Sequence, residues 1–345
     1  MNIIVLTKNK EQYASGYYHQ DLVDSLQSAG NCYLYGDGYK DYNPIDTFDS
    51  VILKSPFEES EIDVVICTTS WDNEESNESV DPHPEINLSL YNKFKKIYFL
   101  NKEYKKLQSR FDYSIKQGFD LVCTVNPLAT EWKKETGISF YYLPFGISLE
   151  RFKDYSCNKK YDFAFTGGLH AIHLDYRYLV KKEIFKSASM DKMANSGTEL
   201  LFSEYPINAE YGEYKIFWAE FGARKWFGLK SLLPHGVAYA KFLNSCKVFL
   251  NTPSASDILN TRSLELMATK TLILCPRVDA YQGFLVDGIN CMMFEPDMSD
   301  FKNVLDDAVN NESKRKKIVD CAHVLASKHS YDKRVESLFM HLKLL

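Results

Sequence analysis

One stretch of the chain, residues 247–277, has the pattern strand, polar loop, helix, strand. Its first apolar run, Val248–Leu250, is closed by the turn-forming residues Asn251–Ser254, and its second, Thr271–Cys275, is stopped by a proline. Between them, from Thr261 onward, apolar residues recur at helical spacing. A unit of this kind belongs to an open, mostly parallel sheet, and such sheets bind ligands beyond the carboxyl ends of their strands. We therefore expect a ligand site in the polar loop that follows the first strand.

Three charged residues stand in that loop and in the first turns of the helix: Asp257, Arg262 and Glu265. A carboxylate near a helix start can accept hydrogen bonds from both hydroxyls of a ribose, and a guanidinium beside it can neutralise a diphosphate through two parallel hydrogen bonds. Solvated charges at the start of a helix would give the same pattern. The rest of the chain has to decide between the two interpretations.

Short apolar runs alternate with helical patterns along the whole chain, and the alternation restarts at Tyr161–Thr166. This arrangement predicts an α/β protein with mostly parallel sheets, and 345 residues are enough for two domains of ordinary size. Residues 205–230 are rich in aromatic side chains, and we assign no element to them. The other expected strands are 2–6, 32–34, 64–68, 96–100, 121–124, 140–143, 200–204 and 291–294, and the expected helices of the first half include 88–94, 103–116 and 129–136.

Composition narrows the class of protein. Hydrophobic residues make up 45% and charged residues 25%, as in a soluble globular protein, and a net charge of −5 argues against a nucleic-acid binder that works through a general basic surface. The 8 cysteines are scattered without a C-x-x-C pair, which indicates reduced thiols and no zinc site. The apolar run at the amino terminus is too short for a signal peptide or a membrane span, so we expect a cytoplasmic protein.

The segment Arg262–Ala268 (RSLELMA) resembles the R-x-x-E-x-M-A signature of group 1 glycosyltransferases, most closely the branch named after a spore maturation protein. Asp257 and Glu265 are spaced like the E-x7-E element of the wider family, with Asp in the first place. Four further segments are similar to the family in order and spacing: LPFG at 143–146, YDFAFTGG at 161–168, DGIN at 287–290 and HSY at 329–331.

The resemblance implies a GT-B fold, in which two Rossmann-like, doubly wound domains face each other across a cleft. It places an acceptor domain at residues 1–153 and a nucleotide-sugar donor domain at residues 154–330. Residues 331–345 are expected to form a helix that packs back toward the first domain.

The resemblance also implies which residues bind the donor. Arg262 is expected to stabilise the leaving diphosphate catalytically, and Glu265 to orient the ribose. The paired glycines Gly167 and Gly168 would let a phosphate approach backbone amides. Arg177 fits either a diphosphate contact or a solvated helix surface. The remaining expected donor contacts are Asp257, His235, Gly236, Val237, Thr261 and Ser263.

On the acceptor side, the loop before the first helix carries Gly16, Tyr17 and His19. Gly16 is similar to the glycine of the corresponding GT-B loop, where the backbone passes close to the donor phosphates or the acceptor. His19 stands where some inverting GT-B enzymes carry a base, although a surface or capping histidine would give the same sequence. Retention and inversion both stay open, because Asp257 replaces the first Glu and Ile258-Leu259 replaces the usual Phe-Gly.

The resemblance therefore implies transfer of a sugar from a nucleoside-diphosphate sugar, UDP first and GDP second, to a glycan, lipid-linked or protein acceptor in bacterial surface polysaccharide or glycoconjugate synthesis. It implies no metal ion, no cofactor besides the sugar nucleotide and no nucleic acid. It allows a peripheral membrane contact and leaves the oligomeric state open. Two alternatives remain: a nucleotide-sugar epimerase of the same fold, and a nucleotide-binding module without activity.

Overall fold

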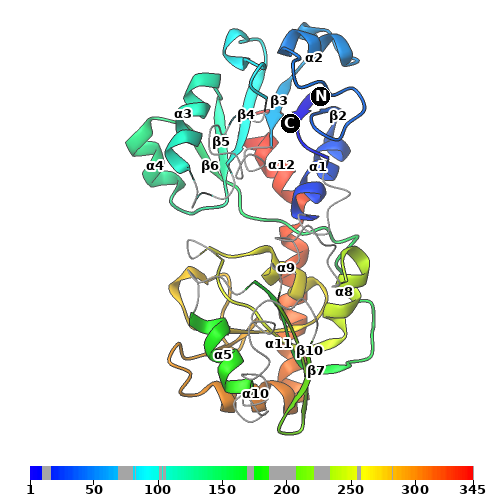
Figure 1. The fold of residues 1–345 in the computed structure, drawn as a ribbon, viewed down its shortest axis with the longest axis vertical. Helices are drawn as coiled ribbons and strands as arrows, with labels where there is room; N and C mark the ends of the chain where they lie inside the picture. The colour runs from blue at the N-terminus through cyan, green and yellow to red at the C-terminus, as the bar shows by residue number, and fades with distance from the viewer. Residues whose placement is uncertain are drawn as a thin grey trace, which may run out of the picture. The chain divides into compact units, whose positions relative to one another are not determined.

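The chain forms two compact units, Met1–Gly146 with Tyr331–Leu345 and Ile147–Ser330 (Figure 1). They are seen in a computed structural model, and each is built around a six-stranded sheet. The structure describes residues 1–9, 17–68, 81, 83–100, 103, 106–168, 175–185, 207–220, 234–254, 258–281 and 283–344.

The sheet of the first unit is parallel throughout and has the strand order β2-β1-β3-β4-β5-β6. The chain enters at β1, adds β2 on one side and then β3 to β6 on the other, so the order reverses between β1 and β3. The strands β3 and β5 are buried along their whole length, as expected for a parallel sheet covered on both faces. The strands are β1 (Asn2–Leu6), β2 (Asn31–Tyr35), β3 (Val64–Cys67), β4 (Lys95–Leu100), β5 (Leu121–Thr124) and β6 (Phe140–Tyr142).

Helix α12 (Tyr331–His341) completes the core of the first unit from a distant part of the sequence. It packs against α1 (Tyr17–Ala29), and the Ser25 hydroxyl donates to Asp332 Oδ1 over 2.7 Å. Four of its residues, Tyr331, Val335, Leu338 and Phe339, share one apolar cluster with β1, β3 and β5. The other helical segments of this unit are α2 (Phe48–Lys54), η1 (Glu59–Glu61), η2 (Leu88–Leu90), α3 (Leu107–Gln117) and α4 (Ala129–Thr136).

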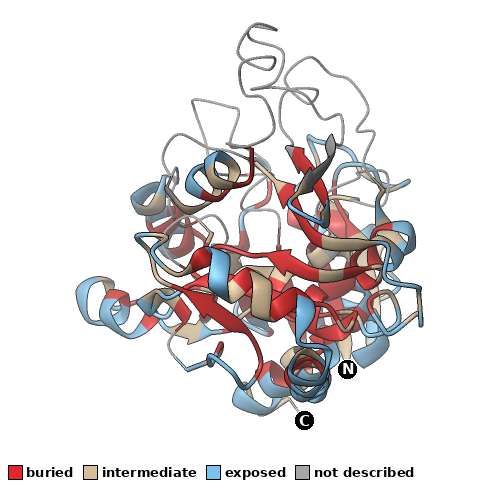
Figure 2. Cartoon of the chain, turned by 90° about the horizontal axis from the view of Figure 1, so that it is seen from below, coloured by how far each residue is buried: buried red, intermediate tan, exposed pale blue. Residues whose placement is uncertain are grey.

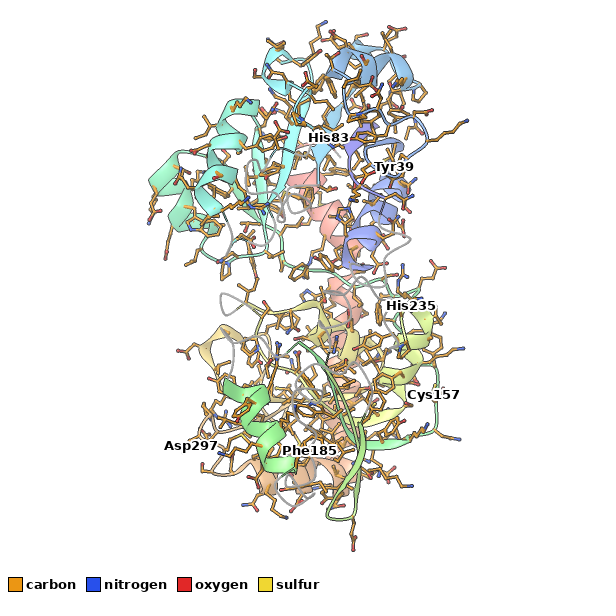
Figure 3. The ribbon with its side chains drawn as sticks, viewed as in Figure 1. Tyr39, His83, Cys157, Phe185, His235 and Asp297 are labelled. Atoms are coloured by element: carbon orange, nitrogen blue, oxygen red, sulfur yellow. The ribbon has the colours of Figure 1, made fainter. Side chains whose placement is uncertain are left out.

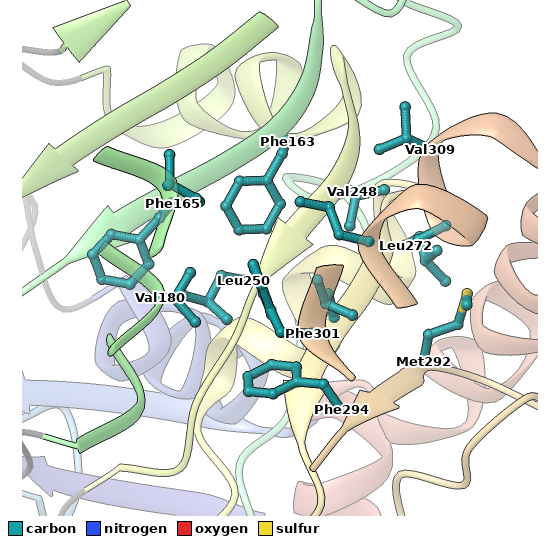
Figure 4. Close-up of a cluster of buried hydrophobic side chains, with 14 of the residues drawn as sticks. Phe163, Phe165, Val180, Val248, Leu250, Leu272, Met292, Phe294, Phe301 and Val309 are labelled. Atoms are coloured by element: carbon teal, nitrogen blue, oxygen red, sulfur yellow. The ribbon is translucent and has the colours of Figure 1, made fainter. Parts of the chain in front are cut away.

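The sheet of the second unit has the order β12-β11-β10-β7-β9-β8, and only the edge pair β8–β9 is antiparallel. Its core joins residues such as Phe163, Leu250 and Phe294 from neighbouring strands with Phe301 of the first turn of α10 (Figure 4). Figure 2 shows the strands largely buried and the outer turns of the helices exposed. The strands are β7 (Tyr161–Gly167), β8 (Ile207–Tyr211), β9 (Tyr214–Glu220), β10 (Cys246–Leu250), β11 (Leu272–Pro276) and β12 (Met292–Phe294). The helical segments are α5 (Asp175–Phe185), α8 (Gly236–Asn244), α9 (Thr261–Ala268), η6 (Asp279–Tyr281), α10 (Phe301–Asn310), α11 (Glu312–Ala326) and η7 (Ser327–His329).

Two differences from the sequence-based expectations stand out. The helix expected over 88–94 is wrong, because only the 3-10 turn η2 forms there and tertiary contacts satisfy its backbone: Gln117 accepts from Leu88 N–H, and the Lys96 ammonium donates to the carbonyls of Leu88 and Tyr91. The unassigned aromatic stretch contains the β8–β9 hairpin, which turns at Gly212 with a φ of 61°. The strand expected at 200–204 lies outside the described residues.

Among the described helices, none has the length and apolar content needed to cross a membrane.

Candidate functional site

The strand order of the second unit also reverses, between β7 and β10. From β7, the sheet continues through β9 and β8 on one side and through β10, β11 and β12 on the other. The carboxyl ends of the two central strands therefore diverge into connections on opposite faces, which creates the usual ligand crevice of an open α/β sheet. Gly167 and Gly168 lie at the end of β7, and Asn251 to Pro253 follow β10.

Arg177, on α5, bridges these two strand ends. Its Nη1 donates to the carbonyl of Gly168 over 2.6 Å, its Nε donates to Thr252 Oγ1 over 2.6 Å, and its Nη2 lies 3.3 Å from the carbonyl of Pro253. Burial lowers the pKa of Arg177, and the positive charge of Arg262 lowers it further. The guanidinium is therefore anchored by neutral groups and lies close enough to a second cation to feel its repulsion.

Arg262, on α9, points to the same strand end. Its Nε donates to Glu265 Oε2 over 2.9 Å, and its Nη1 donates both to the carbonyl and to the Oγ1 of Thr166, over 3.0 and 2.9 Å. The guanidinium lies over the rings of Tyr239 and Phe249, at 5.1 and 5.4 Å from their centroids. Burial lowers the pKa of Arg262, but the attraction of Tyr239 and Glu265 more than offsets it, so the net shift is upward.

The described side chains of the crevice thus carry an excess of positive charge. Two guanidiniums, Arg177 and Arg262, face one carboxylate, Glu265, which is only 8% exposed. Like charges held together in a poorly solvated place repel each other, and a bound anion would relieve that repulsion. The arrangement is suited to a ligand with a phosphate or diphosphate group.

The expected residues at the start of α8 lie beside the same strand. His235 is the N-cap of α8 and is exposed (Figure 3), Gly236 has a φ of 58°, and the Val237 side chain is 46% exposed. One turn further on, the Tyr239 hydroxyl is 2.9 Å from Thr166 Oγ1, which connects α8 to the end of β7 and to Arg262. These positions are open to a ligand, and Tyr239 is an internal support.

The other expected donor residues differ in their surroundings. Thr261 begins α9 and is half-buried. Ser263 is fully buried and its Oγ accepts from Asn251 Nδ2 over 2.8 Å, so its hydroxyl ties α9 to the end of β10. Asp257 lies outside the described residues.

A second concave site belongs to the first unit alone. Its volume is about 40 Å³, and it lies at the carboxyl ends of β3, β4 and β5 beside α1 and α12. Its lining is mainly apolar, with His19, Thr68, Thr124 and Arg334 as polar members. His19 is buried, and its Nε2 is 2.9 Å from Thr7 Oγ1. The remaining lining residues are Tyr18, Leu22, Phe99, Leu100, Cys123, Val125, Leu143, Pro144, Phe145 and Tyr331.

Two expected acceptor-side residues add little here. Gly16 lies outside the described residues, and Tyr17 is the first residue of α1.

The sequence reasoning missed Thr166, Thr252 and Tyr239, which hold the two arginines, and Thr7, which holds His19. The sequence does carry one signal for the threonines, because each stands at or within two residues of the carboxyl end of a buried strand.

The chain resembles known proteins both in sequence and in fold. The sequence model of the family described as "Glycosyl transferase-like" matches residues 211–340, which include β9, α8 and α9. No curated protein matches the chain.

Solved structures resemble the chain over its full length. HepE of Anabaena, solved in complex with UDP and glucose, has a TM-score of 0.60 at 12% identity and covers 100% of both chains. Sucrose-phosphate synthase of Thermosynechococcus elongatus has a TM-score of 0.61 at 10% identity and covers 100% of this chain and 99% of its own. A glycosyltransferase of Rickettsia africae has a TM-score of 0.59 at 11% identity, with coverages of 99% and 97%.

At these identities the structural likeness establishes the fold, and the family match over residues 211–340 adds the class of activity. The predicted α/β architecture with two Rossmann-like sheets is confirmed. The chain carries a glycosyl transferase-like domain and is a glycosyltransferase enzyme of the GT-B fold.

Proposed function

We propose that the enzyme transfers a sugar from a nucleoside-diphosphate sugar, with UDP favoured over GDP, to a glycan, lipid-linked or protein acceptor. The observation that carries the proposal is the pair of guanidiniums, Arg177 and Arg262, with Glu265 at the switch point of the second unit. HepE, which shares the fold, was solved with UDP and with glucose, and this supports UDP as the carrier. The R-x-x-E-x-M-A segment on α9 supports membership of the branch named after a spore maturation protein.

In this proposal the second unit, with residues 154–330 as its donor domain, holds the sugar nucleotide. Glu265 accepts from the ribose hydroxyls, and the amides after β7, at Gly167 and Gly168, receive a phosphate. Asp257 and Thr261 lie on the loop and helix start beside the sugar, Ser263 supports that loop, and the exposed start of α8 (His235, Gly236 and Val237) receives the base.

Transition-state stabilisation follows from the charge balance of the crevice. As the bond between the sugar and the diphosphate breaks, negative charge develops on the leaving oxygen. Arg262 is already fixed by Glu265 and Thr166, so it needs little reorganisation to stabilise that charge. Arg177 adds a second positive charge from the neighbouring helix. We therefore propose that leaving-group stabilisation needs no divalent metal ion.

Residues 1–153, with residues 331–345 as a helix that packs back on them, form the proposed acceptor domain. Gly16, Tyr17 and His19 border the acceptor, and the largely apolar pocket beside His19 accommodates its less polar part. We place the enzyme in the cytoplasm, in bacterial surface polysaccharide or glycoconjugate synthesis, with an acceptor class that allows a peripheral membrane contact. This setting is inferred from the class of enzyme.

A thermal-shift panel tests the donor site. UDP, GDP, CDP, ADP and NAD are added separately to the wild type at about a hundredfold excess over Kd, where a bound ligand adds about 2.7 kcal/mol of stability. UDP should raise the melting temperature most. A response to NAD alone, or to none of the five, would contradict the proposal.

The matched variant is Glu265→Gln, which keeps the size of the side chain and removes its charge. It should lose most of the UDP-dependent shift, because an amide is a weaker acceptor for two ribose hydroxyls than a carboxylate. Release of UDP from a UDP-sugar without transfer or epimerisation would identify hydrolysis, whereas epimerised sugar would favour the epimerase alternative. Tight UDP binding with no turnover of any UDP-sugar would favour the binding module.

Metal independence has its own test. Because two guanidiniums supply the positive charge of the proposed site, EDTA should leave the rate of UDP release from a turning-over UDP-sugar unchanged. The measurement is the initial rate with and without EDTA, followed by readdition of Mg²⁺ or Mn²⁺. A loss that either ion restores would show that the arginines do not suffice.

A further inference from the structure

Two threonines and a histidine form a buried hydrogen-bonded chain in the first unit. Thr7 follows β1, Thr68 follows β3, and His19 stands in the first turn of α1. Thr7 is 0% exposed, and Thr68 and His19 are each 1% exposed. The three lie where the strand order of this sheet reverses, which is the point at which an open α/β sheet binds its ligand.

The backbone fixes the two threonines relative to each other. The parallel ladder of β1 and β3 pairs Leu6 with Cys67, and it continues one residue further, because Thr68 N–H donates to the carbonyl of Leu6 over 3.0 Å. On the other side, Thr7 N–H donates to the carbonyl of Tyr35 over 2.8 Å. β-branched side chains have few χ1 states, so both hydroxyls are held in place.

The direction of the hydrogen bonds follows from counting protons. The Thr68 hydroxyl donates to Thr7 Oγ1 over 2.8 Å, so the Thr7 proton must point elsewhere. The other side-chain partner of Thr7 Oγ1 in the described structure is His19 Nε2, at 2.9 Å. A fully buried hydroxyl proton without an acceptor is costly, and the arrangement that gives both threonine protons an acceptor has Thr7 donating to Nε2.

A nitrogen that accepts a hydrogen bond carries no proton of its own. The neutral His19 ring therefore has its proton on Nδ1. In this tautomer Nδ1 has no lone pair for a proton, and the lone pair of Nε2 is engaged by Thr7. Neither ring nitrogen is then set to take a proton from an acceptor hydroxyl.

We infer that Thr7 and Thr68 are positioning residues that hold neutral His19 in the Nδ1–H tautomer, so that the ring serves the acceptor as a hydrogen-bond donor and not as its base. The part of the inference that concerns the acceptor rests on the proposed function. The tautomer of His19 does not depend on that function, so the tautomer and the role toward the acceptor can be tested by separate experiments.

The test uses the full chain labelled with ¹⁵N in its histidines, at about pH 8.5, some two units above the usual histidine pKa. Long-range ¹H–¹⁵N correlation spectra distinguish a ring nitrogen that carries a proton from one that does not. The chain has 8 histidines, and a His19→Asn spectrum identifies the signals of His19 by subtraction. We expect a protonated Nδ1 and a bare Nε2. A protonated Nε2 in the wild type would overturn the inference.

Variants of Thr7 decide whether the hydroxyl is the cause. Thr7→Val keeps the shape but removes the donor, and should move the ring toward the Nε2–H tautomer. Thr7→Ser restores the hydroxyl and should restore the wild-type signals. Ser25→Ala, which alters the same helix α1 at its contact with Asp332, is the control and should leave the ring unchanged. An unchanged tautomer in Thr7→Val would overturn the inference.

Turnover then tests the link to the acceptor. With a UDP-sugar and acceptor that the wild type uses, Thr7→Val should lower kcat about tenfold, as for other partners that orient a histidine ring, and Thr7→Ser should recover most of it. If the spectra are as expected but the Thr7→Val and His19→Asn variants both have wild-type kcat, the assigned tautomer is confirmed and the positioning role in turnover is wrong. If no sugar nucleotide binds the wild type at all, the proposed function fails and the spectra still decide the tautomer.

Discussion

Replacing Arg262 by alanine should lower kcat about 10²- to 10³-fold, the usual loss when one preorganised donor to developing negative charge is removed. The guanidinium is held from three directions, by Glu265, by Thr166 and by the faces of two aromatic rings, so it is preorganised for this role. The measurement is the steady-state release of UDP from the UDP-sugar that the wild type uses. Near-normal turnover would remove Arg262 from the proposed mechanism.

The Arg262→Ala substitution should also lower the stability of the folded protein, and that effect must be separated from the loss of catalysis. The Arg262 and Glu265 side chains are 19% and 11% exposed, so alanine leaves a poorly solvated carboxylate without its partner. Breaking a buried pair from one side costs about 3–5 kcal/mol, and the partial exposure here puts the expected cost at the lower end. The double variant Arg262→Met, Glu265→Leu removes both charges and should regain much of that stability without regaining activity.

Arg277→Ala is the matched control for the arginine itself. Arg277 belongs to the same unit and is also ion-paired, with Asp287 and Glu295, but its side chain is 46% exposed. Solvent-exposed pairs of this kind contribute little to stability. The variant should keep wild-type turnover and melting temperature, and a large loss there would mean that the assay reports general damage to the unit.

A second large effect is expected from His83 in the first unit (Figure 3). Its ring is packed against Tyr35 and Tyr42 and is 5% exposed, and its Nε2 has no hydrogen-bond partner in the described structure. Burial lowers the pKa of His83 to about 4, and the nearby charge of Asp37 opposes that shift without reversing it. The Asp81 carboxylate accepts from the backbone N–H of His83, not from its ring.

The sign of the effect on stability follows directly. Between pH 6.5 and pH 4 the unfolded chain binds a proton at His83 that the folded chain does not, so the free energy of unfolding falls as the pH falls. Above pH 6.5 His83 is neutral in both the folded and the unfolded chain and does not reduce stability. By pH 4 its titration should lower the free energy of unfolding by about 3 kcal/mol.

Other groups also titrate in this range, so the prediction concerns a difference between two proteins. Urea unfolding of the wild type and of His83→Gln is compared at about pH 7 and pH 4. The variant starts less stable, because it places an amide among aromatic rings, but it should lose about 3 kcal/mol less on acidification. Equal losses in the two proteins would show that His83 is protonated at an ordinary pKa.

Much of the fold was predictable because its strands and helices differ in local pattern. The strand at Leu121–Thr124 and the helix at Ala129–Thr136 have the predicted bounds. The β8–β9 hairpin was missed because its aromatic residues show no clean alternation in the sequence. The turn at Leu88–Leu90 could not be foreseen either, since Lys96 and Gln117, which satisfy its backbone, are known to be neighbours only once the sheet is assembled.

The candidate site was predictable in its residue types but not in its contacts. The resemblance of the R-x-x-E-x-M-A segment implied that Arg262 and Glu265 are separate ligands of one nucleotide, and the structure shows that they also bind each other. The partners Thr166 and Tyr239 come from β7 and α8, far away in the sequence, so only the strand order brings them to the arginine. No motif marks Thr7, because its importance depends on the hydroxyl that faces it from another strand.

The position of α12 has a consequence for how the molecule is made. Because residues 331–344 complete the core of the first unit, the ribosome must synthesise all of residues 147–330 before that core can close. At ~5–20 residues per second this takes about 10 to 40 s. During that time the second unit can fold from contiguous sequence, while the apolar cluster around Ile3, Val5 and Leu26 waits for Val335 and Leu338. The first unit, although its sheet is synthesised before the second unit, is thus completed after it, and its open apolar cluster is a surface that chaperones can cover in the meantime.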